Sequence, residues 1–171
     1  CKVASFDDTK SAQLGSYLPT DLGMDPDESV IWAVDPEDYK ADMLFAFEDG
    51  RVARVALAGY VTKTNRKRLK NAIYGGSKLL YAQALKEDRD LALVSNDGRL
   101  MNFNTSLLKT KTTTNTQGVR AFTAKKNRIV TAVGAIEDFL GSEAWTEKFT
   151  AQALPCAGAL MKEDDMPSLF D

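Results

Sequence analysis

Residues 49–71, DGRVARVALAGYVTKTNRKRLKN, determine the expected fold of this chain. The stretch begins with Asp-Gly, continues as an alternating apolar segment and ends in a loop crowded with positive charge. The same order returns further along the chain, where DGRLMNF at 97–103 precedes Lys109-Thr110-Lys111-Thr112. A shorter copy at positions 2–6 aligns with positions 51–55 at nearly the same offset. Repetition at a period of this length is typical of propellers, solenoids and arrays, so we expect a chain built from repeated units.

Each unit is expected to contain short antiparallel strands. In the middle unit, apolar runs flank Asp49-Gly50, and Asp-Gly between two such runs is a strong hairpin signal. The third unit repeats this arrangement around Asp97-Gly98. Four strands over about 48 residues is the spacing of propeller-type blades. The predicted strands are residues 1–6, 29–34, 43–47, 51–57, 79–85, 91–94, 99–103 and 129–133.

The sequence therefore predicts an all-β chain with a short helical and acidic C-terminal tail. We divide it into a partial blade (residues 1–35), two blades (36–85 and 86–135) and the tail (136–171). With 171 residues the chain has room for one domain with a sizeable core, and its start without Met indicates a piece of a longer polypeptide. Helix is expected only after Ile136, on an apolar pattern formed by Ile136, Phe139, Leu140 and Trp145.

Acidic and basic residues are segregated along the chain, although the formal net charge is only −2. Residues 1–50 carry 3 basic and 12 acidic side chains, whereas residues 51–80 carry 8 basic and no acidic ones. Residues 99–136 are again purely basic, with 7 such side chains, and residues 137–171 return to 2 basic and 8 acidic. The two all-basic blocks occupy matching positions in successive units, which indicates a shared positively charged surface.

The residue types that are missing exclude several kinds of chemistry. The chain has no histidine, so Ser-His and Cys-His nucleophilic pairs and histidine-containing metal sites are ruled out. Carboxylate and lysine chemistry are not excluded, but the case for an enzyme is weaker. The two cysteines, Cys1 and Cys156, fit a reduced cytosolic protein better than a disulfide framework. No run reaches the ~18 consecutive apolar residues that a membrane span needs.

The third unit contains DGRLMNF at 97–103, TNTQGVR at 114–120 and RIV at 128–130. This order resembles the blade repeat in the C-terminal domain of type IIA DNA topoisomerase A subunits, gyrase A and topoisomerase IV A, in which a D/N/K-G-[KR] hairpin and a downstream R/Q-G-V-R element recur. The middle unit is similar to topoisomerase IV A-like proteins through YVTKTNRK at 60–67. The resemblance implies a β-pinwheel, a propeller-like ring of antiparallel blades that exchange strands and bend duplex DNA around the outer rim.

The resemblance also implies how the chain works and with what partners. The glutamine-arginine-arginine-glycine-glycine box of gyrase A does not occur, which favours a topoisomerase IV-like role. In the family the DNA-cleaving tyrosine directly follows an arginine, and no tyrosine here does. The expected function is therefore non-catalytic: to present bent duplex DNA for ATP-dependent strand passage, in the bacterial cytoplasm at the nucleoid. The implied partners are double-stranded DNA, the rest of the A subunit and the B subunit, and Mg²⁺ and ATP belong to the holoenzyme.

Phosphate contact is the expected role of the basic residues, because Lys and Arg displace condensed counterions from duplex DNA. Aromatic residues are not interleaved with them and no recognition helix is evident, so neither base stacking nor base-specific readout is expected. Any sequence preference should then come from how easily the DNA bends. No catalytic or metal-binding residue is predicted. The predicted DNA-binding residues are Arg51, Arg54, Lys63, Arg66, Lys67, Arg68, Lys70, Arg99, Lys109, Lys111, Arg120, Lys125, Lys126 and Arg128.

A second interpretation stays open, namely a propeller-like protein-interaction module whose basic loops dock an acidic partner. Steep salt dependence without sequence preference would support DNA wrapping, whereas absence of DNA binding near physiological salt would support the module. The acidic residues 137–171 are also expected to compete with DNA for the basic loops. Deleting residues 150–171 should then tighten DNA binding at low salt. In the middle unit, Leu69-Lys70-Asn71 stands where the third has Gly118-Val119-Arg120, so blade geometry is expected to differ there.

Overall fold

The computed structural model describes residues 6, 8–33, 39–62, 64, 69–139 and 146–162. The strands are β1 (Asp42–Phe47), β2 (Arg51–Ala56), β3 (Leu79–Leu85), β4 (Asp90–Ser95), β5 (Arg99–Asn104), β6 (Val119–Arg120), β7 (Val130–Gly134), β8 (Thr150–Ala151) and β9 (Ala159–Leu160). The helices are α1 (Leu18–Leu22), α2 (Thr146–Phe149) and the 3-10 helices η2 (Leu57–Tyr60), η3 (Thr105–Leu107) and η4 (Ile136–Asp138).

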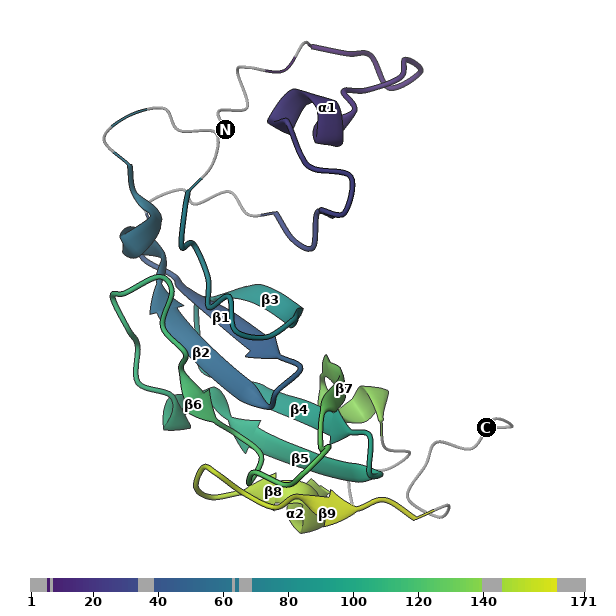
Figure 1. The fold of residues 1–171 in the computed structure, drawn as a ribbon, viewed down its shortest axis with the longest axis vertical. Helices are drawn as coiled ribbons and strands as arrows, with labels where there is room; N and C mark the ends of the chain where they lie inside the picture. The colour runs from purple at the N-terminus through teal and green to yellow at the C-terminus, as the bar shows by residue number, and fades with distance from the viewer. Residues whose placement is uncertain are drawn as a thin grey trace.

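These strands form two mainly antiparallel sheets, which lie one beyond the other along the molecule (Figure 1). The first sheet has the order β3-β1-β2-β6. The second has the order β7-β4-β5-β8, with β9 also paired to β5. The sequence predicted an all-β chain, and the structure confirms that the described residues are mainly β, with short helices in addition. Among the described residues, no helix has the length and apolar character that crossing a membrane would need.

Each sheet is built on a hairpin that the Asp-Gly pairs predicted. Strands β1 and β2 pair from Asp42↔Ala56 to Ala46↔Val52, and β4 and β5 pair over the equivalent positions of the next unit, from Asp90↔Asn104 to Val94↔Leu100. Gly50 and Gly98 have φ values of 79° and 72°, a left-handed conformation that glycine adopts without steric cost. Both hairpin predictions are confirmed.

The third strand of each sheet also repeats. β3 pairs with β1 and β7 pairs with β4, both antiparallel. Each pairing has an irregularity at the same place, between Ala46 and Phe47 in the first sheet and between Val94 and Ser95 in the second. The strands predicted at 79–85 and 129–133 are thus confirmed, and the two units share one topology.

The sheets exchange a strand. β6 lies between β5 and β7 in the sequence, but it pairs with β2 in the first sheet, through Arg51↔Arg120 and Val52↔Val119. Gly118, directly before β6, has φ 66°, and a Cβ there would lie 2.1 Å from the Val52 carbonyl oxygen. Only glycine fits this close approach, which explains the glycine of the sequence GVR at 118–120.

The hydrophobic core joins the two sheets. Side chains alternate along β1, so that Leu44 and Ala46 face one cluster while Met43, Phe45 and Phe47 face another. The first cluster draws on both sheets, and the other two lie on the outer face of one sheet each. Members of the shared cluster include Leu44, Val52, Leu91, Leu93, Met101, Phe103, Phe122 and Val130. The shared core fixes the arrangement of one sheet relative to the other.

The strand predicted at 29–34 is wrong for residues 29–33, which adopt no strand. Val30 and Ile31 are exposed, and only Trp32 packs against the core, at the outer face of the first sheet. The physical reason is the lack of a partner. β3 and β7 each pair with the hairpin of their own unit, whereas no hairpin lies beside 29–33 within the described residues.

Helix also occurs before Ile136, contrary to the prediction. α1 begins at Leu18 with Pro19 in its first turn, where proline needs no amide donor, and Gly23, with φ 59°, caps its C-terminal end. In the tail, Ile136 and Phe139 pack against the second sheet in the third cluster, as part of η4 and the residue that follows it. The predicted strand at 1–6, apart from Phe6, and the residues Leu140 and Trp145 lie outside the described residues.

Candidate nucleic-acid interface

Two loops carry the predicted phosphate contacts. The first rim loop (residues 61–78) joins η2 to β3. The second rim loop (residues 108–129) connects η3 to β7 and includes the short strand β6. Thr114 Oγ1 donates a hydrogen bond to the Asn71 carbonyl oxygen at 2.9 Å. A Cβ at Gly59, just before the first rim loop, would lie 2.9 Å from the Thr112 carbonyl oxygen. The bases of the two rim loops therefore lie against each other.

Lys63, Arg66, Lys67 and Arg68 of the first rim loop lie outside the described residues. Lys70, at the end of this basic stretch, is exposed. The base of the loop is closed by Tyr60, whose hydroxyl donates to the Ala72 carbonyl oxygen at 2.7 Å. Burial raises the pKa of Tyr60 to about 12, so the hydroxyl keeps its proton and can donate this hydrogen bond well above neutral pH.

The second rim loop has a fixed backbone and exposed cations. The Lys111 amide donates to the Arg54 carbonyl oxygen at 2.8 Å, and the Ala56 amide donates to the Lys111 carbonyl oxygen at 2.8 Å. The side chains of Lys109, Lys111 and Lys126 are exposed, and none of them has a carboxylate partner within the described part of the chain. The loop is thus anchored to β2 at Lys111, and its three lysines leave their charges available to an anion.

Lys125 and Arg128 share a carboxylate instead. Lys125 Nζ lies 3.1 Å from Asp97 Oδ2, and Arg128 donates to the same carboxylate through Nε at 3.2 Å and Nη2 at 2.9 Å. The bonds from Arg128 hold the pKa of Asp97 well below its usual range. The Arg128 side chain is only 8% exposed and its guanidinium lies 5.6 Å from the centre of the Phe122 ring. Arg128 is therefore positioned to hold the loop onto the hairpin turn at Asp97.

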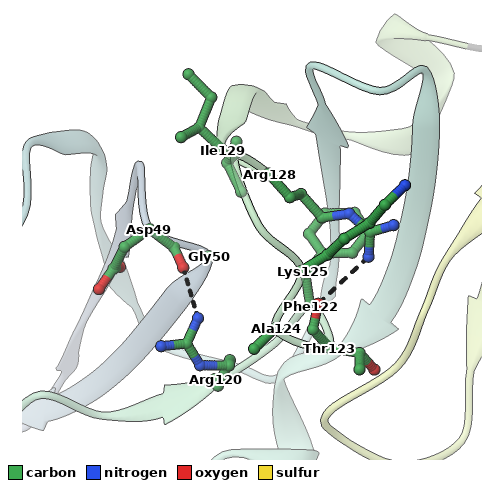
Figure 2. Close-up of a pocket in the computed structure, with 10 residues that line it drawn as sticks. Asp49, Gly50, Arg120, Phe122, Thr123, Ala124, Lys125, Arg128 and Ile129 are labelled. Carbon is green, nitrogen blue, oxygen red and sulfur yellow. Dashed lines mark hydrogen bonds between the residues drawn. The ribbon is translucent and has the colours of Figure 1, made fainter.

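Arg120 faces a different side of the same loop. Figure 2 shows the residues that line an open pocket, in which Arg120 extends toward the turn at Asp49 while Lys125 and Arg128 point the other way. Arg120 Nη1 donates to the Asp49 carbonyl oxygen at 3.2 Å, and no carboxylate pairs with its guanidinium among the residues described. The pocket therefore presents one uncompensated cation rather than three converging ones.

The remaining predicted arginines contact the protein itself. Arg54 Nε lies 2.5 Å from Asp42 Oδ2, and its Nη1 lies 2.7 Å from Asp88 Oδ1. Burial opposes the charge of Arg54, but these bonds outweigh it and raise the pKa. Arg51 Nε lies 3.3 Å from Asp49 Oδ2. Arg99 Nη1 donates to the Gly158 carbonyl oxygen at 2.7 Å.

The structure thus sorts the fourteen predicted residues into four groups. Four lie outside the described residues, four are in ion pairs, two bond to backbone carbonyls and four are exposed lysines. In that order they are Lys63, Arg66, Lys67 and Arg68; Arg51, Arg54, Lys125 and Arg128; Arg99 and Arg120; and Lys70, Lys109, Lys111 and Lys126. Lys78 was not among the predictions, yet it is exposed at the end of the first rim loop. Its position in the all-basic block of residues 51–80 was the sequence signal that could have identified it.

Two sheets on a shared core, each a repeat of the other and joined by an exchanged strand, define the β-pinwheel type of fold. The chain is similar to the C-terminal domain of DNA topoisomerase IV (TM-score 0.68, 21% identity, 78% of this chain and 42% of that one). It is also similar to the E. coli ParC C-terminal domain (TM-score 0.66, 14% identity, 89% and 68%) and to the DNA gyrase A C-terminal domain (TM-score 0.50, 16% identity, 75% and 47%).

These similarities establish the fold that the sequence resemblance implied. The chain spans less than half the length of the topoisomerase IV and gyrase A domains. No protein-family model and no curated protein matches the sequence.

Proposed function

We propose that this chain is a non-catalytic DNA-binding and DNA-wrapping domain of a type IIA topoisomerase A subunit, most similar to topoisomerase IV. One observation carries the proposal. Five exposed lysines without a carboxylate partner among the described residues lie on two rim loops whose bases are in contact. These lysines are Lys70, Lys78, Lys109, Lys111 and Lys126.

Such a surface suits the sugar-phosphate backbone rather than base edges. Lysine is a flexible point charge that binds phosphate without bidentate geometry, and it contributes affinity that does not depend on sequence. No helix among the described residues is long enough to act as a recognition helix in the major groove, because α1 spans five residues and α2 four. The domain would bend duplex DNA and present it to the strand-passing core, where Mg²⁺ and ATP act in the holoenzyme.

The first experiment is a titration with a random-sequence duplex of about 40 base pairs at several salt concentrations. If six to ten phosphates are contacted, affinity should fall by about 10³ to 10⁵ between about 50 and 200 mM salt. Equal affinity for unrelated sequences completes the expected result. Failure to bind near physiological salt would overturn the proposal and favour a module that docks an acidic protein.

A variant with Lys109, Lys111 and Lys126 replaced by Ala tests the surface itself. Because each phosphate contact contributes about 0.9 to the slope of log affinity against log salt, the slope should fall by about 3. The control replaces Lys10 and Lys86, which are exposed but lie outside both rim loops, and is compared with the triple variant per lysine removed. If the control lost as much slope per lysine as the triple variant, the binding would come from overall charge and not from this interface.

A further inference from the structure

Two segments of the chain occupy the same place on the two hairpins. We call residues 110–121 the first donor segment and residues 150–161 the second donor segment. In the first sheet Val55 forms a parallel bridge with Lys111, and in the second Phe103 pairs in parallel with Ala151. Val55 and Phe103 are equivalent positions of the two hairpins, because Asp49-Gly50 aligns with Asp97-Gly98. Lys111 and Ala151 are therefore equivalent as well.

The offset between Lys111 and Ala151 is kept to the end of both donor segments. Arg120 pairs with Arg51, and Leu160 pairs with Arg99. The Ala121 amide donates to the Gly50 carbonyl oxygen at 2.7 Å, as the Met161 amide does to the Gly98 carbonyl oxygen at 2.9 Å.

The glycines before β6 and β9 complete the correspondence. Gly118 and Gly158 have φ values of 66° and 67°. A Cβ at Gly158 would lie 3.0 Å from the Leu100 carbonyl oxygen, the counterpart of the Val52 oxygen beside Gly118. The second donor segment is therefore a structural repeat of the first.

The two donor segments differ in charge. The first contains Lys111 and Arg120, whereas the second, TAQALPCAGALM, has no charged residue. At the position of Lys111 stands Ala151, which is buried at 7% exposure in the shared core. At the position of Arg120 stands Leu160, which is 53% exposed. Where the first donor segment has two cations, the second therefore has a buried alanine and an exposed leucine.

We propose that the second donor segment is an uncharged cap that ends the DNA-contacting rim at the second sheet. It fills the acceptor edge of β5, which would otherwise be open to another strand, without adding a phosphate contact. The backbone follows the same path in both donor segments, so the side chain at position 160 determines that phosphate contact ends at the second one. This inference rests on the proposed function.

Reciprocal substitutions test it in the full chain. Leu160→Arg gives the cap the cation of the first donor segment, and Arg120→Leu gives the first donor segment the leucine of the cap. The slope of log affinity against log salt for the same duplex should rise by about 1 with Leu160→Arg and fall by about 1 with Arg120→Leu. Leu160→Gln is the control for polarity without charge and should match the wild type. Ala157→Lys, at an exposed position of the same segment, provides a second added cation if Leu160→Arg does not fold.

The outcomes separate the inference from the function on which it rests. If the wild-type chain shows no salt-dependent DNA binding, both the proposed function and the cap are overturned. A wild-type chain with a steep slope, combined with an unchanged slope in Leu160→Arg and Ala157→Lys, overturns the cap alone. An equal gain with Leu160→Gln would show that charge is not the cause, and an unchanged slope in Arg120→Leu would show that the exchanged strand does not contact DNA. Either result also overturns the cap.

Discussion

Arg54 connects three segments of the chain through one guanidinium group. It bonds to Asp42 on β1, to Asp88 in the link between β3 and β4, and to the Thr105 carbonyl oxygen at 3.4 Å after β5. The first hairpin is thereby tied to the second unit. A residue whose donors are used in this way is fitted to hold the fold, although its charge and its place in an all-basic block gave it a predicted role in DNA contact.

Replacing Arg54 by Met should lower the free energy of unfolding by about 2 kcal/mol, because Asp42 and Asp88 lose their shared partner. The folded variant should bind DNA with nearly wild-type affinity. Urea unfolding and DNA titration at the same salt measure the two quantities. Arg54→Lys is the second variant. A lysine ammonium group lacks the planar guanidinium that bridges both carboxylates, so this variant should not restore the wild-type stability. Weakened DNA binding with unchanged stability would instead place Arg54 in the interface.

The hairpins could be predicted because their signals are local. Asp-Gly with alternating apolar residues on either side specifies the turn and the strands without reference to the rest of the chain. Residues 29–33 resemble β3 in composition, yet they form no strand because strand formation depends on a partner as much as on propensity.

The short strands at the sheet edges could not be predicted from periodicity. β6, β8 and β9 have two residues each, which is too short for an alternating pattern, and their positions depend on distant carbonyl groups. The candidate interface divides in the same way. The sign of the charge could be predicted from the sequence, but whether a cation faces solvent or a carboxylate depends on tertiary contacts, as Lys126 and Arg128 illustrate.

The structure also shifts the boundary at which the acidic tail can be removed. β8 and β9 lie within residues 150–162 and pair with β5, so a deletion from position 150 would expose the edge of the second sheet. Deleting only residues 163–171 removes four carboxylates and leaves both strands. If the tail competes for the rim loops, this shorter deletion should tighten DNA binding at low salt and have little effect at high salt. If the full chain and the shortened chain bind DNA with the same affinity at low salt, the competition is ruled out.

At the scale of the whole molecule, the two sheets behave as one body. They share the core around Leu44, Val52 and Phe103, and the backbone at the turn of the first hairpin accepts hydrogen bonds from the second unit at Glu48 and Gly50. The described ends of the two rim loops therefore start from a common body, and Asn71 of one contacts Thr114 of the other. We expect a duplex that contacts both loops to bend, because the two sheets that carry the loops share one core.

The final prediction concerns DNA bending. Curving a site of about 20–30 base pairs by about 40–90° costs about 1 to 6 kcal/mol and depends on the stiffness of the sequence. A duplex with central TA and CA steps should therefore bind more tightly than a stiff A-tract duplex, and a difference of about 1.4 kcal/mol would appear as a tenfold change in affinity. Energy transfer between dyes at the duplex ends should report a shorter end-to-end distance in the complex. The Lys109, Lys111 and Lys126 triple variant should return that distance toward the value of free DNA. Equal affinity for both duplexes, with an unchanged end-to-end distance at saturation, would mean that the rim binds DNA without wrapping it.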